Sequence, residues 1–335
     1  MSNKVVVLGP NSGDLKSDKE LKRIKDLKSV SKKFHNIELV FVDSSRSLGE
    51  VLNDCKNAVV ILPTAILEEL SIIAEKIPTL KLIQTFSAGT DWIDKIKLAE
   101  LGVDVANNNG ANAVSVAEHA ICLMFAVYRK LDQQIESVKN GKWMNNVIGE
   151  ISEFHTLVNK RVGIIGLGRI GSRVSKRLHG WECKLFYYDS EKFNKNYVRE
   201  SGASYLGFNE LIESCDIITL HVPLDRTTKQ MISTLEFQRM KKTAILINTC
   251  RGQVVDESAM IKALNKKEIF GVGLDVTEVE PIQADNPLLN MTNVVLTPHL
   301  ATRSIESQWN SFENSLKNAS KVINGNIADS IVKPI

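Results

Sequence analysis

The stretch VGIIGLGRIGSRVSKRL, residues 162–178, decides the fold of this chain. It begins with a short apolar run, passes through Gly166, Gly168 and Gly171, and continues with apolar and basic residues at helical spacing. Glycines spaced G-x-G-x-x-G between a strand and a helix are typical of a loop that holds a dinucleotide pyrophosphate, because N–H groups at a helix N-terminus attract anions. The sequence therefore predicts a phosphate-binding turn formed by Gly166, Leu167, Gly168, Arg169, Ile170 and Gly171.

The next apolar run, KLFYYDS, ends in Asp189. A carboxylate at this distance past the glycines is placed to bind the hydroxyls of the adenosine ribose. The alternative is that Asp189 only caps the turn that follows it. A carboxylate repels a 2′-phosphate and no arginine follows closely, so the sequence favours NAD over NADP, although Lys192 adds one positive charge nearby.

Short apolar runs recur along the whole chain and are separated by amphipathic segments of helix length. Runs without polar alternation suit strands that are covered on both faces, and strand–helix alternation suits parallel sheets. The sequence thus predicts an α/β protein with two doubly wound parallel-sheet domains. The runs begin at Val5, Ile37, Ala58, Lys81, Val103, Val162, Lys184, Asp216, Ala244, Phe270 and Asn293.

The connection between the two domains is predicted at a loop and a long helix. The loop NNNGAN, residues 107–112, is rich in residues that adopt unusual backbone conformations, and one helical pattern follows from about residue 113 to 137. After Pro298 ends the last strand, residues 304–325 predict a final amphipathic helix. Because chain termini often lie close together, this helix could return to the first domain.

Composition excludes several classes of protein. A net charge of +3 with mixed signs does not indicate a nucleic-acid partner, and no apolar segment is long enough to span a membrane. Five scattered cysteines without CxxC spacing argue against disulfides and against a zinc site, and the N-terminus lacks a signal-peptide pattern. We expect a cytoplasmic protein without a metal.

Three polar residues follow predicted strands of the second domain: Arg251 in INTCRG, Glu280 in GLDVTEVEP and His299 in TPHLA. A guanidinium binds a carboxylate substrate in a bidentate manner, and a histidine can accept the proton of a hydroxyl whose carbon loses hydride. Glu280 could fix the tautomer of His299. Taken one at a time, each residue also has a role without chemistry: Arg251 as a surface arginine, Glu280 as a turn residue and His299 as a structural histidine.

The chain resembles the D-isomer-specific 2-hydroxyacid dehydrogenases. The motifs that carry the resemblance occur in family order: SAGTDWID, NNNGANAVSVAEHA, GIIGLGRIG, LHVPLDRTTKQMI, INTCRG, GLDVTEVEP and TPHLA. The resemblance implies a flavodoxin-like substrate domain, residues 1–106 and 300–335, and an inserted Rossmann NAD-binding domain, residues 107–299. It also implies an active site in the cleft between the two domains.

The resemblance assigns roles to individual residues. Arg251 matches the substrate-binding arginine, Glu280 the glutamate that orients the histidine, and His299 the acid/base histidine. In reduction His299 gives a proton to the carbonyl oxygen, and its pair with Glu280 favours the imidazolium. The remaining matches are the carboxylate-binding loop at Ala88 and Gly89, the cofactor-side loop at Val222, Pro223 and Thr228, the backbone of Cys250 near nicotinamide, and Asp275 near the carboxamide.

Several alternatives stay open. His221 in LHVPL is the rival histidine, although no acidic residue is placed for it as Glu280 is for His299. His119 is expected to pack in its helix, and Trp143 to anchor an arm of a homodimer. A dinucleotide-sensing corepressor on the same scaffold is a second hypothesis, and formate or phosphite oxidation is a third. The acid itself is open among glyoxylate, hydroxypyruvate, a branched 2-oxo acid and 3-phosphoglycerate.

Overall fold

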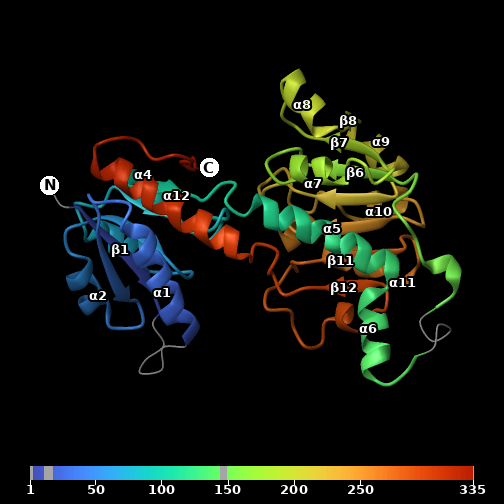
Figure 1. Ribbon diagram of the computed structural model, residues 1–335, viewed down its shortest axis with the longest axis horizontal. Helices are drawn as coiled ribbons and strands as arrows, with labels where there is room; N and C mark the ends of the chain where they lie inside the picture. The colour runs from blue at the N-terminus through green and yellow to red at the C-terminus, as the bar shows by residue number, and fades with distance from the viewer. Residues whose placement is uncertain (1–2, 11–17, 144–148, 335) are drawn as a thin grey trace. The chain divides into compact units, whose positions relative to one another are not determined.

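The computed structural model describes residues 3–10, 18–143 and 149–334, which form two compact units (Figure 1). The first unit is Met1–Asn112 with Ser304–Ile335, and the second is Ala113–Arg303. These boundaries lie a few residues after the predicted ones. Each unit is built around one parallel sheet, and the predicted fold class is confirmed.

The first unit has a five-stranded sheet in the order β2-β1-β3-β4-β5, which is the flavodoxin-like order. Successive residues of its strands face opposite sides, so Val6 and Leu8 pack in one cluster while Val5 and Val7 pack in the other. The strands are β1 (Lys4–Gly9), β2 (Glu38–Asp43), β3 (Ala58–Pro63), β4 (Leu82–Gln84) and β5 (Asp104–Ala106).

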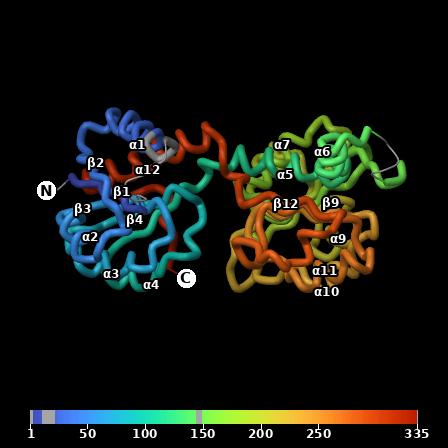
Figure 2. The backbone as a smooth tube through the Cα atoms, turned by 90° about the horizontal axis from the view of Figure 1, so that it is seen from below, coloured from blue at the N-terminus to red at the C-terminus, as the bar shows by residue number. Residues whose placement is uncertain are grey.

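Helices cover both faces of this sheet. The C-terminal helix α12 (Ile305–Ile323) packs beside α1 (Asp18–Ser31) and against β3 and β4, so segments from both ends of the chain belong to the first unit (Figure 2). Ser304 caps α12, because its hydroxyl accepts from Ser307 N. The other face carries α2 (Leu48–Cys55), α3 (Leu70–Glu75) and α4 (Lys95–Glu100).

The second unit has a seven-stranded sheet in the order β12-β11-β10-β9-β6-β7-β8, with every described pair parallel. This is the Rossmann order with one added strand. The two-residue strand β8 was not predicted, because Ser204–Tyr205 offers no apolar run. The strands are β6 (Arg161–Ile165), β7 (Lys184–Tyr188), β8 (Ser204–Tyr205), β9 (Ile217–Leu220), β10 (Ile245–Asn248), β11 (Gly271–Leu274) and β12 (Val294–Leu296).

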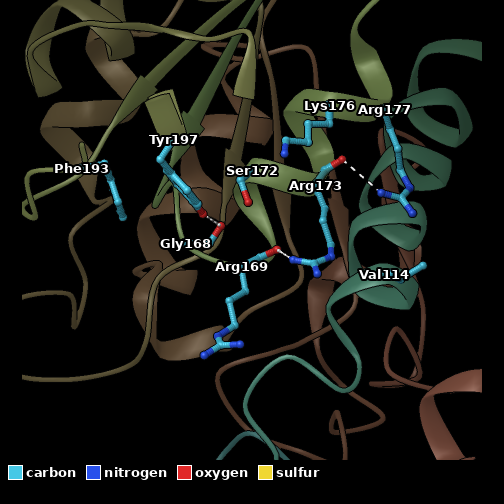
Figure 3. Close-up of a pocket in the computed structure, with 9 residues that line it drawn as sticks. All are labelled: Val114, Gly168, Arg169, Ser172, Arg173, Lys176, Arg177, Phe193 and Tyr197. Atoms are coloured by element: carbon cyan, nitrogen blue, oxygen red, sulfur yellow. Dashed lines mark hydrogen bonds between the residues drawn. The ribbon is translucent and has the colours of Figure 1, made fainter. Parts of the chain in front are cut away.

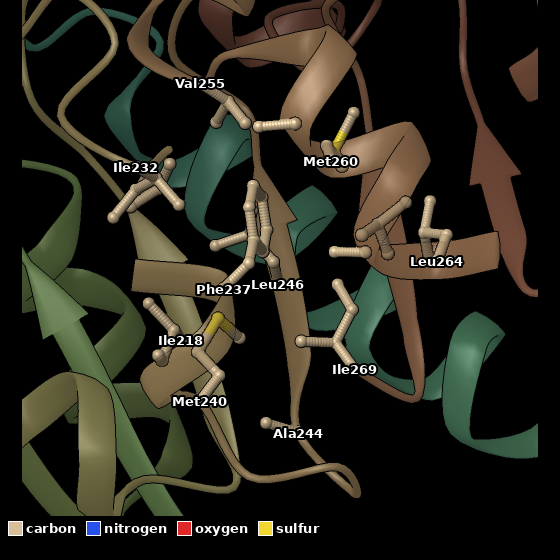
Figure 4. Close-up of a cluster of buried hydrophobic side chains, with 14 of the residues drawn as sticks. Ile218, Ile232, Phe237, Met240, Ala244, Leu246, Val255, Met260, Leu264 and Ile269 are labelled. Atoms are coloured by element: carbon tan, nitrogen blue, oxygen red, sulfur yellow. The ribbon is translucent and has the colours of Figure 1, made fainter. Parts of the chain in front are cut away.

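Two apolar clusters close the faces of the second sheet. One face packs against α5 (Ala113–Arg129) and α7 (Gly171–Leu178), with α8 (Lys195–Ser201) beside α7. The other face packs against α9 (Phe208–Ser214), α10 (Thr234–Arg239) and α11 (Glu257–Asn265). Phe237 is fully buried in that cluster beside Leu246 (Figure 4). These cores fix the strand ends, where the candidate site residues follow.

The predicted long helix over residues 113–137 is wrong, because the structure has two helices there. Helix α5 ends at Arg129, Lys130 takes a left-handed φ of 47°, and α6 (Leu131–Lys139) runs in a different direction (Figure 1). The buried stripe of α5 stops at Tyr128, whereas Leu131, Ile135 and Val138 of α6 are exposed. A lysine in a left-handed conformation leaves no mark in an apolar periodicity.

Candidate active site

The glycine loop follows β6 at the point where the strand order reverses between β6 and β9. Gly166 has a φ of +93°, and a Cβ there would meet the His221 carbonyl oxygen at 2.5 Å. A Cβ on Gly171 would meet the Gly166 carbonyl oxygen at 2.0 Å, whereas a Cβ on Gly168 would meet nothing within 4 Å. The outer glycines therefore serve chain packing, and Gly168 leaves open space for a close ligand.

Asp189 lies just past β7 and has two hydrogen bonds to backbone N–H groups. Its Oδ2 accepts from Leu167 N at 2.7 Å, and its Oδ1 accepts from Glu191 N at 2.9 Å. The second bond is the turn cap that the sequence left open as an alternative. The first bond ties Asp189 to the glycine loop, so the carboxylate lies beside the predicted phosphate turn.

A pocket of about 650 Å³ opens beside this loop and is strongly cationic (Figure 3). Tyr197 from α8 supports the loop, since its hydroxyl donates to Leu167 O at 3.0 Å. Arg177 pairs with Glu118 and Lys176 pairs with Glu200, both at the surface. The cluster of basic residues in the pocket, Arg173, Lys176 and Arg177, was not predicted. Their spacing of three and four residues on one helix does indicate that they share a face. The pocket is lined by Val114, Gly168, Arg169, Ser172, Arg173, Lys176, Arg177, Phe193 and Tyr197.

The cofactor-side loop after β9 contacts the glycine loop. Val222 Cγ1 lies 3.1 Å from where a Gly166 Cβ would be. The loop holds its own shape, because Thr228 Oγ1 donates to Pro223 O at 2.6 Å and accepts from Asp225 N at 2.9 Å. An open second glycine and cationic side chains at the start of helix α7 together fit a dinucleotide phosphate.

His299 and Glu280 are brought together in the second unit. His299 Nδ1 lies 2.6 Å from Glu280 Oε2, and the two side chains are 41% and 39% exposed. Glu280 Oε1 accepts from Thr277 N at 3.2 Å, which leaves Oε2 directed at the ring. Because Nδ1 is occupied by the carboxylate, Nε2 is the ring atom left to meet another molecule.

Arg251 follows β10 on a loop that packs closely against the loop carrying Glu280. A Cβ on Gly252 would meet Thr277 O at 1.9 Å and Glu278 N at 2.5 Å, so only glycine permits this approach. The Arg251 Nη1 donates to Cys250 O at 2.7 Å. Burial raises the pKa of the Cys250 thiol to about 11, which fits a small packing group rather than a nucleophile.

Asp275 is almost completely buried, and both of its carboxylate oxygens accept hydrogen bonds. Leu300 N and Thr297 Oγ1 donate to Oδ1, and Ala301 N donates to Oδ2. Burial alone would raise the pKa of Asp275, but the neighbouring His119 ring and the hydrogen bonds from Thr297 and the backbone lower it. This network was not predicted, because its members are far apart in sequence.

His221, the rival histidine, lies in a different environment. Its Nε2 is 2.9 Å from Thr219 Oγ1, and its buried Nδ1 has no hydrogen-bond partner among the described residues. Burial lowers the pKa of His221 to about 3, so the ring is neutral near pH 7. Without a carboxylate beside it, His221 lacks the arrangement that His299 has.

The remaining site predictions concern other parts of the chain. Ala88 and Gly89 lie in the first unit on the loop after β4, where Ala88 O accepts from Asn107 Nδ2 and Gly89 O accepts from Ser87 Oγ. Trp143 is 83% exposed in the second unit. In the described part of the chain, no helix combines the length and the apolar character that a membrane span needs.

Comparison with known proteins identifies the family. The profile of the D-isomer specific 2-hydroxyacid dehydrogenase NAD binding domain matches residues 121–301. The glyoxylate reductase of Korarchaeum cryptofilum is 35% identical over 289 residues, which cover 86% of each chain. The glyoxylate/hydroxypyruvate reductase B of Salmonella paratyphi A is 34% identical over 261 residues, covering 78% of this chain and 80% of that protein.

A solved structure agrees with these sequence matches. The D-lactate dehydrogenase of Lactobacillus jensenii with NAD+ has a TM-score of 0.80 and is 30% identical, over 98% of this chain and 99% of that one. The glycine loop and all the residues lining the cationic pocket except Val114 lie within the matched NAD-binding domain. The chain therefore belongs to the D-isomer-specific 2-hydroxyacid dehydrogenase family and is an NAD-dependent oxidoreductase.

Proposed function

We propose that the enzyme reduces a small 2-oxo acid of the glyoxylate or hydroxypyruvate type to the 2-hydroxy acid, in the D form where the product is chiral. The observation that carries the proposal is the 2.6 Å contact between His299 Nδ1 and Glu280 Oε2. Relatives of similar length are named glyoxylate reductase and glyoxylate/hydroxypyruvate reductase, which favours this substrate class. Those names do not favour the corepressor hypothesis.

The proposed proton transfer follows from this geometry. Bound NADH supplies the hydride to the carbonyl carbon. His299 holds a proton on Nε2 and gives it to the carbonyl oxygen, while Glu280 stabilises the charged ring through Nδ1–H. In the direction of oxidation, neutral His299 takes the hydroxyl proton.

Arg251 is proposed to bind the substrate carboxylate. A guanidinium can hold a carboxylate by two parallel N–H donors and still polarise an adjacent carbonyl group. The tight contact at Gly252 supports this role, because it fixes the Arg251 loop against the Glu280 loop. Backbone N–H groups at Ala88 and Gly89 are proposed to complete carboxylate binding, which makes the first unit the substrate-binding domain.

Each cofactor contact is likewise a proposal. Within the loop of residues 166–171, the N–H groups past Leu167 and the Arg169 side chain would bind the pyrophosphate, and Asp189 would bind the ribose hydroxyls, which favours NAD over NADP. Around the nicotinamide ring we propose the loop of Val222, Pro223 and Thr228, the Cys250 backbone, and Asp275. The support for these roles is the open space at Gly168 and the cationic pocket beside it.

We also propose a homodimer. Leu131, Ile135 and Val138 form one exposed apolar stripe along α6, and Trp143 is exposed shortly after the helix ends. An apolar stripe of this kind on a surface helix is typical of a protein contact, and light scattering would give the mass. A cytoplasmic location also stays a prediction, consistent with free thiols at all five cysteines.

The test is a substrate panel followed by NADH consumption. We expect glyoxylate and hydroxypyruvate to give higher kcat/KM than pyruvate, a branched 2-oxo acid or 3-phosphohydroxypyruvate. His299→Ala serves as the inactive variant, and His179→Ala, at an exposed helix end, serves as the matched histidine control. Preference for a branched or phosphorylated acid would refute the proposed substrate class, and turnover of none would refute the proposed activity.

A further inference from the structure

His119 lies in the second turn of α5 and contacts the residues that surround His299 in the chain. Its Nε2 is 2.9 Å from Thr297 Oγ1 and 3.4 Å from Asp275 Oδ1. Its side chain is 25% exposed, whereas Asp275 is only 1% exposed. A histidine that merely fills space on a helix would not need this polar contact.

The direction of the hydrogen bonds can be assigned. A hydroxyl has one proton, and Thr297 Oγ1 donates it to Asp275 Oδ1 at 2.6 Å. The Thr297 oxygen therefore accepts from His119, which must carry its proton on Nε2. The result is an ordered chain from the His119 ring through the Thr297 hydroxyl to the Asp275 carboxylate.

Asp275 in turn holds the backbone on both sides of His299. Its carboxylate accepts from Leu300 N at 2.9 Å and from Ala301 N at 2.8 Å, and its carbonyl oxygen accepts from His299 N at 2.8 Å. His299 has a φ of 52°, in the left-handed region that residues with a Cβ rarely adopt. These bonds stabilise the conformation that places the ring beside Glu280.

A second bond links α5 to the same segment. Ser115 Oγ donates to Ala301 O at 2.7 Å, one turn before His119 on the helix. The segment 297–301 is thus bonded to α5 at both of its ends, by His119 at Thr297 and by Ser115 at Ala301. This double attachment makes α5 the support for the backbone that carries His299.

We propose that His119 is a positioning residue for the reaction, acting through Thr297 and Asp275 on the backbone of His299. The proposal rests on the proposed role of His299 as acid/base. It assigns no contact with substrate or cofactor to His119. Loss of the ring N–H should therefore reduce kcat for 2-oxo acid reduction while NADH binding persists.

The matched variants are His119→Leu and His119→Gln. Leucine fills the volume without a donor, whereas glutamine keeps an N–H donor near the position of Nε2. We expect about a tenfold loss of kcat in His119→Leu and near wild-type kcat in His119→Gln, because a lost buried hydrogen bond costs on the order of a tenfold effect. NADH affinity should stay within about twofold in both variants, and His179→Leu should match wild type.

Thr297→Val tests the same chain from its middle and leaves α5 unchanged. We expect Thr297→Val and the double variant His119→Leu/Thr297→Val each to match His119→Leu, since the two residues act as one unit. In the enzyme without cofactor, the ring signals of His299 in a ¹H–¹⁵N NMR spectrum should shift in His119→Leu and not in His119→Gln. Independent residues would instead give about a hundredfold loss in the double variant.

The outcomes separate the two proposals. If His299→Ala is inactive while His119→Leu or Thr297→Val keeps wild-type kcat, the positioning role is wrong and the proposed function stands. If His299→Ala remains active, the proposed function is wrong. Equal impairment of the leucine and glutamine variants, or equal losses in NADH affinity and kcat, would show that His119 only packs in the fold.

Discussion

His299 and His221 follow strands of the same sheet, yet their surroundings differ in every respect that matters for proton transfer. His299 is exposed and bonded to a carboxylate through Nδ1. The His221 ring is desolvated, bonded to a threonine hydroxyl, and has a pKa lowered to about 3. Position at a strand end therefore does not identify a candidate acid/base, whereas the partner of the ring does.

The largest expected effect removes each ring in turn. We expect His299→Ala to lower kcat for 2-oxo acid reduction by about 10²- to 10⁴-fold, the usual contribution of a general acid. His221→Gln should lose less than about tenfold, because a neutral ring contributes no proton near pH 7. Steady-state kinetics with saturating NADH measure both. The reverse order of effects would make His221 the acid.

The second prediction concerns Arg251. We expect Arg251→Lys to lower kcat/KM by about a hundredfold, because lysine keeps the charge but cannot hold the carboxylate and the carbonyl in line. NADH affinity, measured by fluorescence titration, should be unchanged. Near-normal kcat/KM in this variant would show that a point charge is sufficient.

The third prediction removes the feature that distinguishes His299 from His221. Glu280→Gln keeps size but removes the carboxylate that contacts Nδ1 at 2.6 Å and orients the ring, so reduction should fall by about tenfold. Oxidation should fall with it, because the same ring gives the proton in one direction and takes it in the other. Steady-state kinetics in both directions measure the effect. Unchanged kcat in both directions would make Glu280 a turn residue.

The last prediction concerns stability rather than activity, at His221. Its folded pKa of about 3 lies below the ordinary 6.5, so the unfolded chain binds the proton first and stability falls as pH drops below 6.5. At pH 5 this loss is about 2 kcal/mol. Urea unfolding of the protein without cofactor should show that His221→Gln loses about that much less between pH 7.5 and pH 5. Parallel curves would mean that His221 is solvated.

Local signals explain what the sequence could predict. Short runs of adjacent residues predict the glycine loop, the strand ends and the final helix. Gly166 could therefore be assigned to a turn, and Asp189 and His299 to strand ends, from the sequence alone. The contact of His299 with Glu280 joins residues only 19 positions apart. That pair was expected from the resemblance and from the need of a histidine for a carboxylate.

Other features depend on contacts that no local pattern records. His119 and Thr297 are 178 positions apart, and a helical histidine by itself predicts only packing. The break between helices α5 and α6 at Lys130 could not be predicted from the sequence, because a lysine carries no preference for a left-handed conformation. The cationic pocket joins residues of α7 with Phe193 and Tyr197, which the helix pattern alone does not bring together.

The strand order of the second sheet also sets the order of the candidate residues across the sheet. Going from β12 to β9, the strands are followed in turn by His299, Asp275, Arg251 and His221, which is the reverse of their order along the chain. Neighbouring strands are about 4.8 Å apart, which makes the row roughly 14 Å long. Insertions in the connecting segments cannot reorder this row. Under the proposed roles, a change of substrate must come from side chains that face the row, because backbone hydrogen bonding sets the spacing between His299, Arg251 and the loop after β9.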